Sequence, residues 1–420
     1  MRVLKRGSLA THMHIKSSSR LARSQFLRHM ATIAGGSAAG QLIVLAATPF
    51  LSRIYSPAQF GEYAVFLAVC NVFVAVACLR YDAALNASAD NQIVRVFIVA
   101  CLAAAVTAAL VLVLVSSKWG EELFRRAVGA QLNPSWIAAA ALICGIYQAT
   151  STFAIRRGQF AWSSILRAGQ PAMFSVAAIT LPIGLVGSCL LGFLTALPVA
   201  AKFISGLRPA DMRDVISEAW RLREFPLMSL PTSILDTVSL AIPIWYISSH
   251  YSPMDAGNYA QAQRLLAAPL MLFALAVGQV FMKRAGDIIR AGQSVRGFQR
   301  RVVISLAVAT CVGLVCVGLF GSPALSLLLG SHWRTDTAFL LLVFAPVAVR
   351  CCVSPVTGIF ILQRRLRICA IWQTFYFLVT SGLFWTFAGD VSLEHLLVVY
   401  VGSEFFCYVV YLHLADRVAL

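Results

Sequence analysis

The feature that most constrains the fold is a succession of apolar runs that recurs from residue 31 almost to the end of the chain. An α-helix needs about 20 predominantly apolar residues to cross a hydrocarbon core of about 30 Å, and these runs have that length. The chain is 59% hydrophobic and 12% charged, whereas soluble domains average about 45–50% apolar and about 25% charged residues. We therefore predict an all-α polytopic membrane protein.

On this criterion the sequence predicts twelve transmembrane helices. They cover residues 31–52, 60–80, 93–116, 135–155, 168–186, 187–206, 228–249, 257–282, 301–320, 336–361, 367–388 and 391–413. The fifth and sixth spans are separated only by the region from Gly184 to Gly187.

An internal repeat divides these spans into two groups. The stretch Tyr55–Ala64 returns 196 residues later as Tyr251–Ala260, with Tyr, Ser, Pro, Gly, Tyr and Ala at matching places. Six predicted spans separate the two copies, so both copies face the same side of the membrane. We therefore expect a parallel repeat, with two pseudo-symmetric six-helix halves related by an axis along the membrane normal.

This repeat leads to a predicted division of the whole chain into five parts. They are a basic cytoplasmic arm (1–30), an N-terminal six-helix lobe (31–206), a cytoplasmic linker (207–227), a C-terminal six-helix lobe (228–413) and a cytoplasmic tail (414–420).

The basic residues favour one orientation in the membrane. The net charge is +17, and of the 34 Lys and Arg residues 27 fall on the side of the N-terminal arm, 5 on the other side and 2 within predicted spans. Because cytoplasmic loops are enriched in Lys and Arg, both termini are expected in the cytoplasm. The positive charge then needs no nucleic-acid partner.

Two segments outside the spans admit more than one interpretation. Residues 1–30 are rich in Arg and Ser and contain no acidic residue, which is typical of an organelle transit peptide. A cytoplasmic arm, or a start codon assigned too early with Met13 or Met30 as the true start, explains the same pattern. In the linker, the spacing of Ile216, Trp220, Leu222 and Phe225 suits an amphipathic helix on the membrane surface.

Charged residues in or beside the spans are the candidate functional residues, because a charge inside a bilayer is costly. Arg264 and Arg350 fall within predicted spans, and Arg53 and Arg80 fall at span ends. Guanidinium groups bind phosphate oxygens through two parallel hydrogen bonds, so these four arginines are candidate substrate-binding cations of a central cavity. Interfacial anchoring is the alternative role for Arg53, Arg80 and Arg264.

Asp236, about a third of the way across the seventh span, is the candidate ion-coupling residue. Its alternative role is to pair with an arginine on a neighbouring helix. The sequence has no GxxxxGK[ST], GxSxG or HExxH motif and no Cys or His spacing typical of a metal site. We therefore expect no catalytic residues, no cofactor and no bound metal, and we do not expect an enzyme.

Several ordered motifs resemble those of the bacterial polysaccharide flippases, the O-antigen and exopolysaccharide translocases of the MOP exporter superfamily. The resemblance extends over nearly the whole chain after residue 30. The motifs are Gly35–Gln41, Pro49–Gly61, Leu79–Leu85, Arg223–Leu227, Gly257–Ala260 and Leu329–Trp333.

The resemblance implies an alternating-access transporter of the bacterial inner membrane. Such a protein would move undecaprenyl-diphosphate-linked oligosaccharides to the periplasmic leaflet for surface polysaccharide synthesis, with the diphosphate and sugars held in a cationic cavity. The implied partners are the lipid-linked oligosaccharide and the bilayer, and the polysaccharide polymerase and chain-length machinery are further candidates.

Three other functions fit the same composition. A drug or metabolite exporter of the MATE type would favour acidic cavity residues for cationic substrates, and few acids lie in these spans. A membrane polymerase or ligase is expected to carry a sizeable outer loop, and the longest outer loop, residues 117–134, is short. A non-transporting scaffold of the export machinery is the third possibility.

Overall fold

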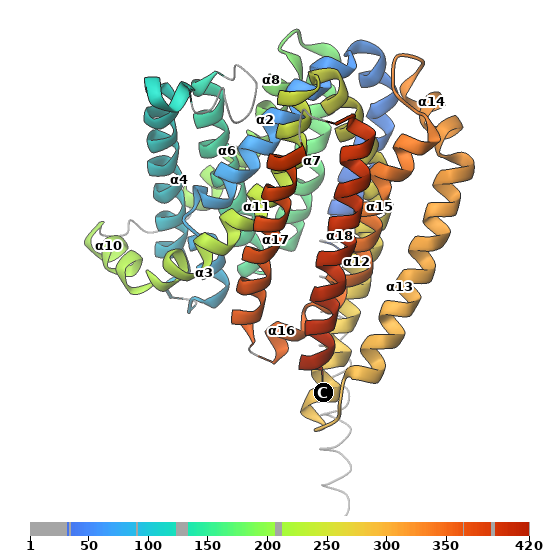
Figure 1. The fold of residues 1–420 in the computed structure, drawn as a ribbon. Coiled ribbons are helices and arrows are strands. Elements are labelled where there is room, and N and C mark those ends of the chain that lie inside the picture. Colours follow the sequence, from blue (N-terminus) through green and yellow to red (C-terminus); the bar gives the residue numbers. More distant parts are fainter. Residues whose placement is uncertain are drawn as a thin grey trace, which may run out of the picture.

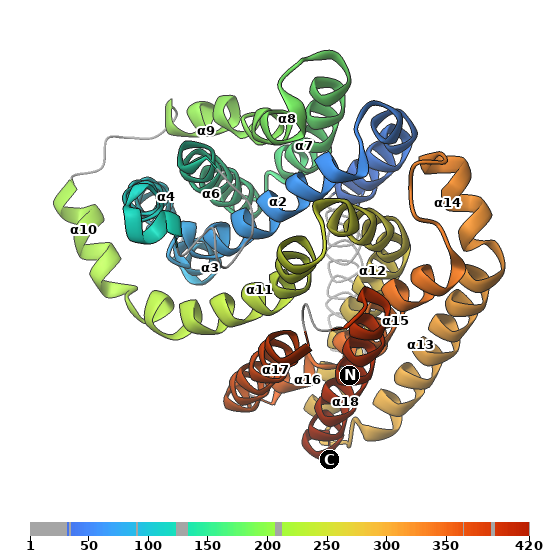
Figure 2. The same cartoon turned by 45° about the horizontal axis from the view of Figure 1, so that its top comes forward.

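The protein is a bundle of membrane-length helices arranged in two halves (Figures 1 and 2). The computed structural model describes residues 32, 35–89, 91–122, 133–205, 212–363, 365–387 and 391–419, and these residues form no β-strand. The predicted arm, residues 1–30, lies outside the described residues. The predicted all-α fold is confirmed.

The first half begins with the span Gly35–Ile54. Its other helices are α2 (Pro57–Ala77), α3 (Tyr81–Ala87), α4 (Ile93–Ser116), α6 (Pro134–Arg156), α7 (Phe160–Thr180), α8 (Gly184–Phe193) and α9 (Ala196–Ser205). Within this half, α4 packs against α6, and α7 packs against α8.

The second half follows the short helix α10 (Met212–Arg221). Its longest members are α11 (Glu224–His250), α12 (Pro253–Arg290), α13 (Arg296–Cys316), α15 (Thr337–Val353), α17 (Leu366–Phe387) and α18 (Leu393–Val418). A π-helical turn (Val317–Gly321) joins α13 to α14 (Ser322–Leu329), and a 3-10 turn (Ser354–Val356) precedes α16 (Ile359–Leu362). Within this half, α15 packs against α18, and α11 packs against α17.

The described residues contain eleven helices that are long and apolar enough to span a membrane. The fifth predicted span, residues 168–186, corresponds to α7, which is 21 residues long but is not among the eleven. The prediction that this span begins at residue 168 is wrong, because α7 begins at Phe160. Arg167, which the prediction placed in a loop, therefore lies within a helix.

The predicted amphipathic face of the linker is divided in the structure. On α10, the large apolar residues Met212, Ile216 and Trp220 follow one another at four-residue intervals and are exposed by 56%, 53% and 66%. Leu222 and Phe225 instead pack against the core of the first half. The exposed stripe of α10 has the pattern of a helix that lies at a membrane surface.

The two copies of the repeated stretch begin α2 and α12 by the same local chemistry. Ser56 and Ser252 cap the helices by accepting hydrogen bonds from the backbone N–H groups of Gln59 and Asp255, and a proline follows each serine at the first helical position. A serine cap followed by proline satisfies the free amide groups at a helix start. The repeated motif is therefore a pair of helix starts.

The tyrosine that precedes each cap is anchored in an equivalent way in both halves. The Tyr55 hydroxyl donates to the Ala178 carbonyl at the end of α7, and the Tyr251 hydroxyl donates to the Val391 carbonyl after α17, each at 2.9 Å. Each tyrosine thus ties its helix start to the end of the fifth long helix of its own half. We call the end of the bundle where both copies lie the turn face.

At the turn face, α2 and α12 cross at van der Waals contact between their backbones. A Cβ atom at Gly61 would overlap the Pro253 carbonyl, and a Cβ atom at Gly257 would overlap the Pro57 carbonyl. The two glycines and the two prolines are each 196 residues apart in the sequence. The contact is therefore reciprocal, as expected for two halves related by pseudo-twofold symmetry.

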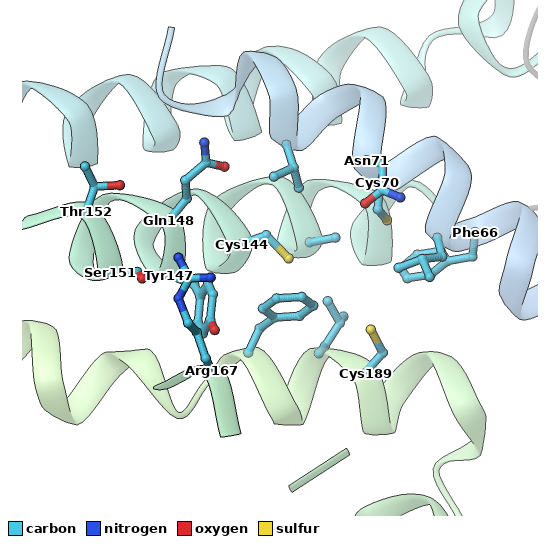
Figure 3. A pocket seen from close by; sticks show the side chains of 15 residues that line it. Phe66, Cys70, Asn71, Cys144, Tyr147, Gln148, Ser151, Thr152, Arg167 and Cys189 are labelled. Atoms are coloured by element: carbon cyan, nitrogen blue, oxygen red, sulfur yellow. The ribbon is translucent and has the colours of Figure 1, made fainter. Parts of the chain in front are cut away.

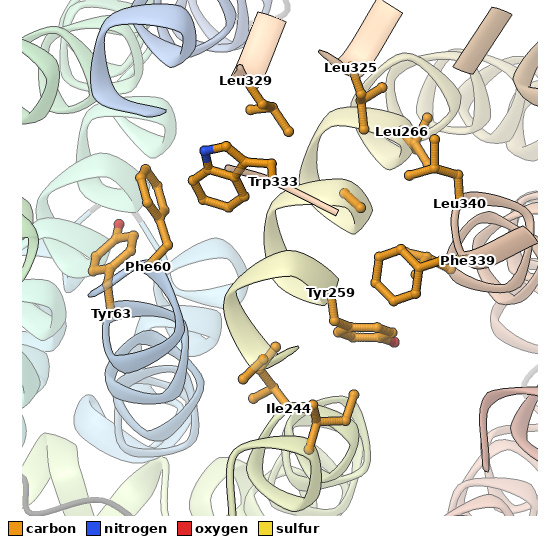
Figure 4. Close-up of a cluster of buried hydrophobic side chains, with 14 of the residues drawn as sticks. Phe60, Tyr63, Ile244, Tyr259, Leu266, Leu325, Leu329, Trp333, Phe339 and Leu340 are labelled. Carbon is orange, nitrogen blue, oxygen red and sulfur yellow. The ribbon is translucent and has the colours of Figure 1, made fainter. Parts of the chain in front are cut away.

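Buried side chains from both halves surround this crossing (Figure 4). Phe60 of α2 lies edge-on to Trp333, with ring centroids 5.2 Å apart, and the Trp333 indole N–H donates to the Ser52 carbonyl at 3.2 Å. Tyr259 of α12 is almost completely buried nearby. The turn face is thus closed by apolar packing and close backbone contact between the two halves.

The crossing predicts that Gly61→Ala and Gly257→Ala destabilise the protein. Each added methyl group would have to displace a backbone carbonyl, and such overpacking typically costs about 1–3 kcal/mol. Thermal unfolding of the purified protein in detergent measures the effect. Gly402→Ala is the matched control, because this glycine of α18 has open space around its Cβ position. Equal stability of all three variants would contradict the described crossing.

Candidate functional site

Two of the four predicted cations lie at opposite ends of α2. Arg53 is exposed at the turn face, and Arg80 is half-buried after the other end of the helix. The 21 residues of α2 extend about 30 Å at about 1.5 Å per residue. One small anionic group therefore cannot contact both guanidinium groups at the same time.

Arg80 occupies an unusual backbone position. It and Leu79 both have positive φ angles, 63° and 46°, which is uncommon for residues other than glycine and costs of order 1 kcal/mol or more for each residue. The buried Nε of Arg80 has no hydrogen-bond partner among the described residues. The sequence motif that contains Arg80 is thus a strained turn between α2 and α3.

Arg264 projects from the second half toward the first. It is half-buried on α12, and its charge lies close enough to Tyr63 of α2 and Cys189 of α8 to interact with them. Of the four predicted cations, Arg264 is therefore the one for which the structure gives neighbours across the two halves.

Arg350 forms a buried ion pair within the second half. Its Nε and Nη2 atoms donate to Glu404 Oε2 and Oε1 at 3.0 and 2.7 Å, and its Nη2 also lies 2.7 Å from the Tyr376 hydroxyl and 2.8 Å from the Tyr400 hydroxyl. Its side chain is 18% exposed and that of Glu404 is fully buried. These four residues, the Arg350 cluster, join α15, α17 and α18, and the charge of Arg350 is compensated.

Asp236 is held by an amide group on a neighbouring helix. Gln373 of α17 donates from Nε2 to Asp236 Oδ1 at 3.0 Å, and Asp236 is exposed on α11. The carboxylate is near enough to Arg350 to interact with its charge. Ion coupling at Asp236 stays a prediction.

The Arg350 cluster predicts a specific pattern of stabilities. Glu404→Gln would leave the guanidinium without a counter-charge, and breaking a buried pair costs about 3–5 kcal/mol. The double replacement Arg350→Met with Glu404→Leu removes both charges and should recover much of that loss. Thermal unfolding of the purified variants measures this difference. A double variant as unstable as the single one would contradict the ion-pair account.

A cavity of about 430 Å³ lies inside the first half (Figure 3). Residues of α2, α6, α7 and α8 line it, and Cys189, the neighbour of Arg264, is among them. Six lining residues carry polar groups: Asn71, Tyr147, Gln148, Ser151, Thr152 and Arg167. None of the lining residues is an aspartate or a glutamate.

Arg167 gives this cavity its charge. Its Nη1 donates to the Ser37 hydroxyl at 3.3 Å, and its buried Nε has no hydrogen-bond partner among the described residues. It forms no ion pair with a carboxylate in the described part of the chain. A buried charge is stable only when it is paired or well hydrogen-bonded, so the site would favour an anionic ligand.

The other polar groups around the cavity are positioned by contacts between helices. Gln148 of α6 donates to Asp82 of α3 at 2.7 Å, and the hydroxyls of Ser151 and Ser163 lie 3.2 Å apart. Arg167 is also near enough to Tyr147 for its charge to interact with the tyrosine hydroxyl, and Figure 3 labels both among the lining residues. The cavity thus combines one cation, an aromatic ring, amides and hydroxyls.

Arg167 is not among the predicted site residues, because a fifth span that begins at residue 168 leaves it in a loop. The usable signal was helical periodicity, since Ser163, Arg167 and Gln170 are spaced i, i+4 and i+7 and so share one face of a helix. Extending the fifth span toward residue 160 would have placed all three within it.

Comparison with known proteins identifies the class. A model of the polysaccharide biosynthesis protein family matches residues 50–337. Among curated protein sequences, none matches the chain.

Two solved structures share the fold over most of the chain. An inward-facing multidrug resistance MATE family transporter of the MOP superfamily is 13% identical, with a TM-score of 0.67, and the match covers 90% of this chain and 94% of that one. The lipid II flippase MurJ in an inward closed conformation is 11% identical, with a TM-score of 0.64, and the match covers 91% of this chain and 86% of that one. At these identities the likeness concerns the fold.

The two-halved helical bundle therefore has the fold of MOP superfamily transporters and makes the chain a multi-pass membrane protein. By its sequence, the chain belongs to the polysaccharide biosynthesis protein family, whose model matches more than half of its length.

Proposed function

We propose that the chain moves undecaprenyl-diphosphate-linked oligosaccharide repeat units from the cytoplasmic to the periplasmic leaflet of the bacterial inner membrane. Its product would supply the synthesis of surface polysaccharide such as O-antigen. Family membership supports a role in polysaccharide biosynthesis, and the cavity around Arg167 is the observation that carries the substrate assignment. A guanidinium that has no carboxylate partner among the described residues, and that lies beside amides, hydroxyls and an aromatic ring, suits a glycan with an anionic group.

The alternative of a cationic-drug exporter is less well supported. A cationic substrate would be stabilised by carboxylates, and the lining of the cavity contains none. The MATE-like fold does not decide between the two functions, because the MATE and MurJ structures match the chain to a similar extent.

The proposed orientation puts the turn face in the periplasm and both termini in the cytoplasm. The distribution of Lys and Arg along the sequence supports this assignment through the positive-inside rule. With the halves in contact at the turn face, the path would then be closed on the periplasmic side.

Alternating access follows from this arrangement. The halves would separate at the Gly61 and Gly257 crossing while they approach each other on the cytoplasmic side. In this scheme Arg167 and Arg264 bind the anionic part of the substrate midway across the membrane. Arg80 contacts it where it is loaded on the cytoplasmic side, and Arg53 contacts it where it is released at the turn face. Arg350 would act on the substrate only if the Glu404 pair opened, and Asp236 remains the candidate for ion coupling.

The cellular test is the sidedness of the lipid-linked repeat units after deletion of the gene. We expect these intermediates to accumulate on the cytoplasmic face and surface polysaccharide to disappear, with both effects reversed by the intact chain. Intermediates that still reach the periplasmic face at the normal rate would contradict the proposed function.

Substitution of Arg167 tests the site itself. A hydrogen bond to a charged group contributes about 1.5–3 kcal/mol, so Arg167→Ala should reduce export of lipid-linked units about ten- to hundredfold. Arg167→Lys keeps the positive charge but loses the planar guanidinium group. Its rate of export should lie between those of the wild type and Arg167→Ala. Arg417→Ala, at the exposed end of α18, is the control. Wild-type export by a stably folded Arg167→Ala variant would exclude this cavity from the substrate path.

A further inference from the structure

A second hollow lies outside the first half, between α12 and α13, and has a volume of about 310 Å³. Phe273, Val277, Phe298, Val302 and Leu306 give it apolar walls. The remaining lining residues are Arg284, Arg301 and Ser305. The hollow is therefore apolar with two guanidinium groups, and it is separate from the Arg167 cavity.

The two arginines lie at the same level of the helix pair. Arg284 is six residues before the end of α12, and Arg301 is five residues after the start of α13, which places them about 8–9 Å from the adjoining helix ends at about 1.5 Å per residue. Because a short connection, residues 291–295, joins the antiparallel helices, both side chains fall where the apolar surface of each helix stops. That is the level of lipid headgroups for helices that cross a bilayer.

Nearby arginines pair with carboxylates, whereas the described residues provide no carboxylate partner for these two. Arg290 pairs with Asp287, and Arg296 and Arg300 both pair with Asp416 at 2.6 and 3.3 Å. Arg301 donates to the Gly297 carbonyl at 3.3 Å. In the part of the chain that the structure describes, neither Arg284 nor Arg301 forms an ion pair with a carboxylate. The hollow thus has a local excess of positive charge.

Its apolar walls are partly open to the surroundings. Phe273 is 45% exposed, and Phe298 is fixed by stacking on Phe281 with ring centroids 5.7 Å apart. A soluble phosphate would leave this apolar surface uncovered. A phosphate that carries acyl chains would place its negative charge beside the two guanidinium groups and its acyl chains against the apolar walls.

We propose that this hollow binds an anionic phospholipid of the surrounding bilayer. Arg284 and Arg301 hold its phosphate through charge-assisted hydrogen bonds, and an acyl chain lies along Phe273, Val277 and Leu306. Basic pockets between transmembrane helices are known to bind acidic lipid headgroups. A lipid bound in this way links α12 to α13 at the end opposite the turn face. This site does not depend on the transported substrate.

The test uses the purified full-length protein in detergent, titrated with phosphatidylglycerol or with phosphatidylcholine. Native mass spectrometry measures retained lipid, and thermal unfolding measures stabilisation. We expect phosphatidylglycerol to be retained at least severalfold better than phosphatidylcholine and to raise the unfolding temperature. In the double variant Arg284→Gln with Arg301→Gln, retention of phosphatidylglycerol should fall about tenfold. Arg290→Gln, which removes a neutralised arginine outside the hollow, should bind as the wild type does.

Three results would overturn the proposal. The first is a double variant that retains phosphatidylglycerol as well as the wild type does, while its lipid-free unfolding temperature is unchanged. The second is equal retention of the two lipids by the wild-type protein. The third is displacement of phosphatidylglycerol by an equimolar amount of undecaprenyl phosphate, which would assign the hollow to the polyprenyl carrier. If the double variant unfolds without lipid, the single variants Arg284→Lys and Arg301→Lys replace it and should each weaken retention.

Discussion

The structure depends on the close crossing of α2 and α12, where Gly61 meets the Pro253 carbonyl and Gly257 meets the Pro57 carbonyl. Only residues without a Cβ allow this approach. The same contact between a glycine and a proline carbonyl occurs twice, because the sequence motif that contains both residues is repeated. The contact draws the two halves together at the turn face, and apolar side chains such as Phe60 and Trp333 pack around it. The contact is built from apolar packing, close backbone approach and neutral hydrogen bonds such as that from Trp333 to Ser52. It can separate without leaving a buried charge unpaired, as the proposed alternating-access cycle requires.

The charges of Arg350 and Arg167 are stabilised in different ways. In the second half, Arg350 is satisfied by Glu404 and two tyrosine hydroxyls, so its charge stabilises the packing of three helices. In the first half, Arg167 lines a cavity with a neutral serine as its hydrogen-bond partner. The same residue type therefore supports two roles, which depend on whether a carboxylate lies within reach. This difference is the physical basis for the proposal that Arg167, and not Arg350, binds the anionic group of the substrate.

The sequence was sufficient for the features that depend on local patterns. Apolar runs predicted the helices, and the repeated Tyr-Ser-Pro stretches predicted two parallel halves, because serine caps and prolines act within a few residues. The pairing of Arg350 with Glu404 could not be read from the sequence, since 54 residues separate them and several other polar groups were equally available. Arg167 could not be predicted as a cavity residue for a different reason. The polar residues of α7 lower the mean hydropathy of this helix, so the apolar run begins only at residue 168, although the helix begins at Phe160. The meeting of Gly61 with Pro253 also required the three-dimensional structure, although the repeat predicted equivalent positions for the two turns.

We propose that this chain moves a lipid-linked anionic glycan across a bilayer by way of the Arg167 cavity. The most direct measurement is transfer of undecaprenyl-diphosphate-linked oligosaccharide between leaflets of proteoliposomes that contain only the purified protein. We predict transfer that requires the protein and that falls about ten- to hundredfold in Arg167→Ala, as expected for the loss of about 1.5–3 kcal/mol of charge-assisted binding. Folded protein that leaves the glycan in its original leaflet, under every ion gradient and membrane potential applied, would contradict the account.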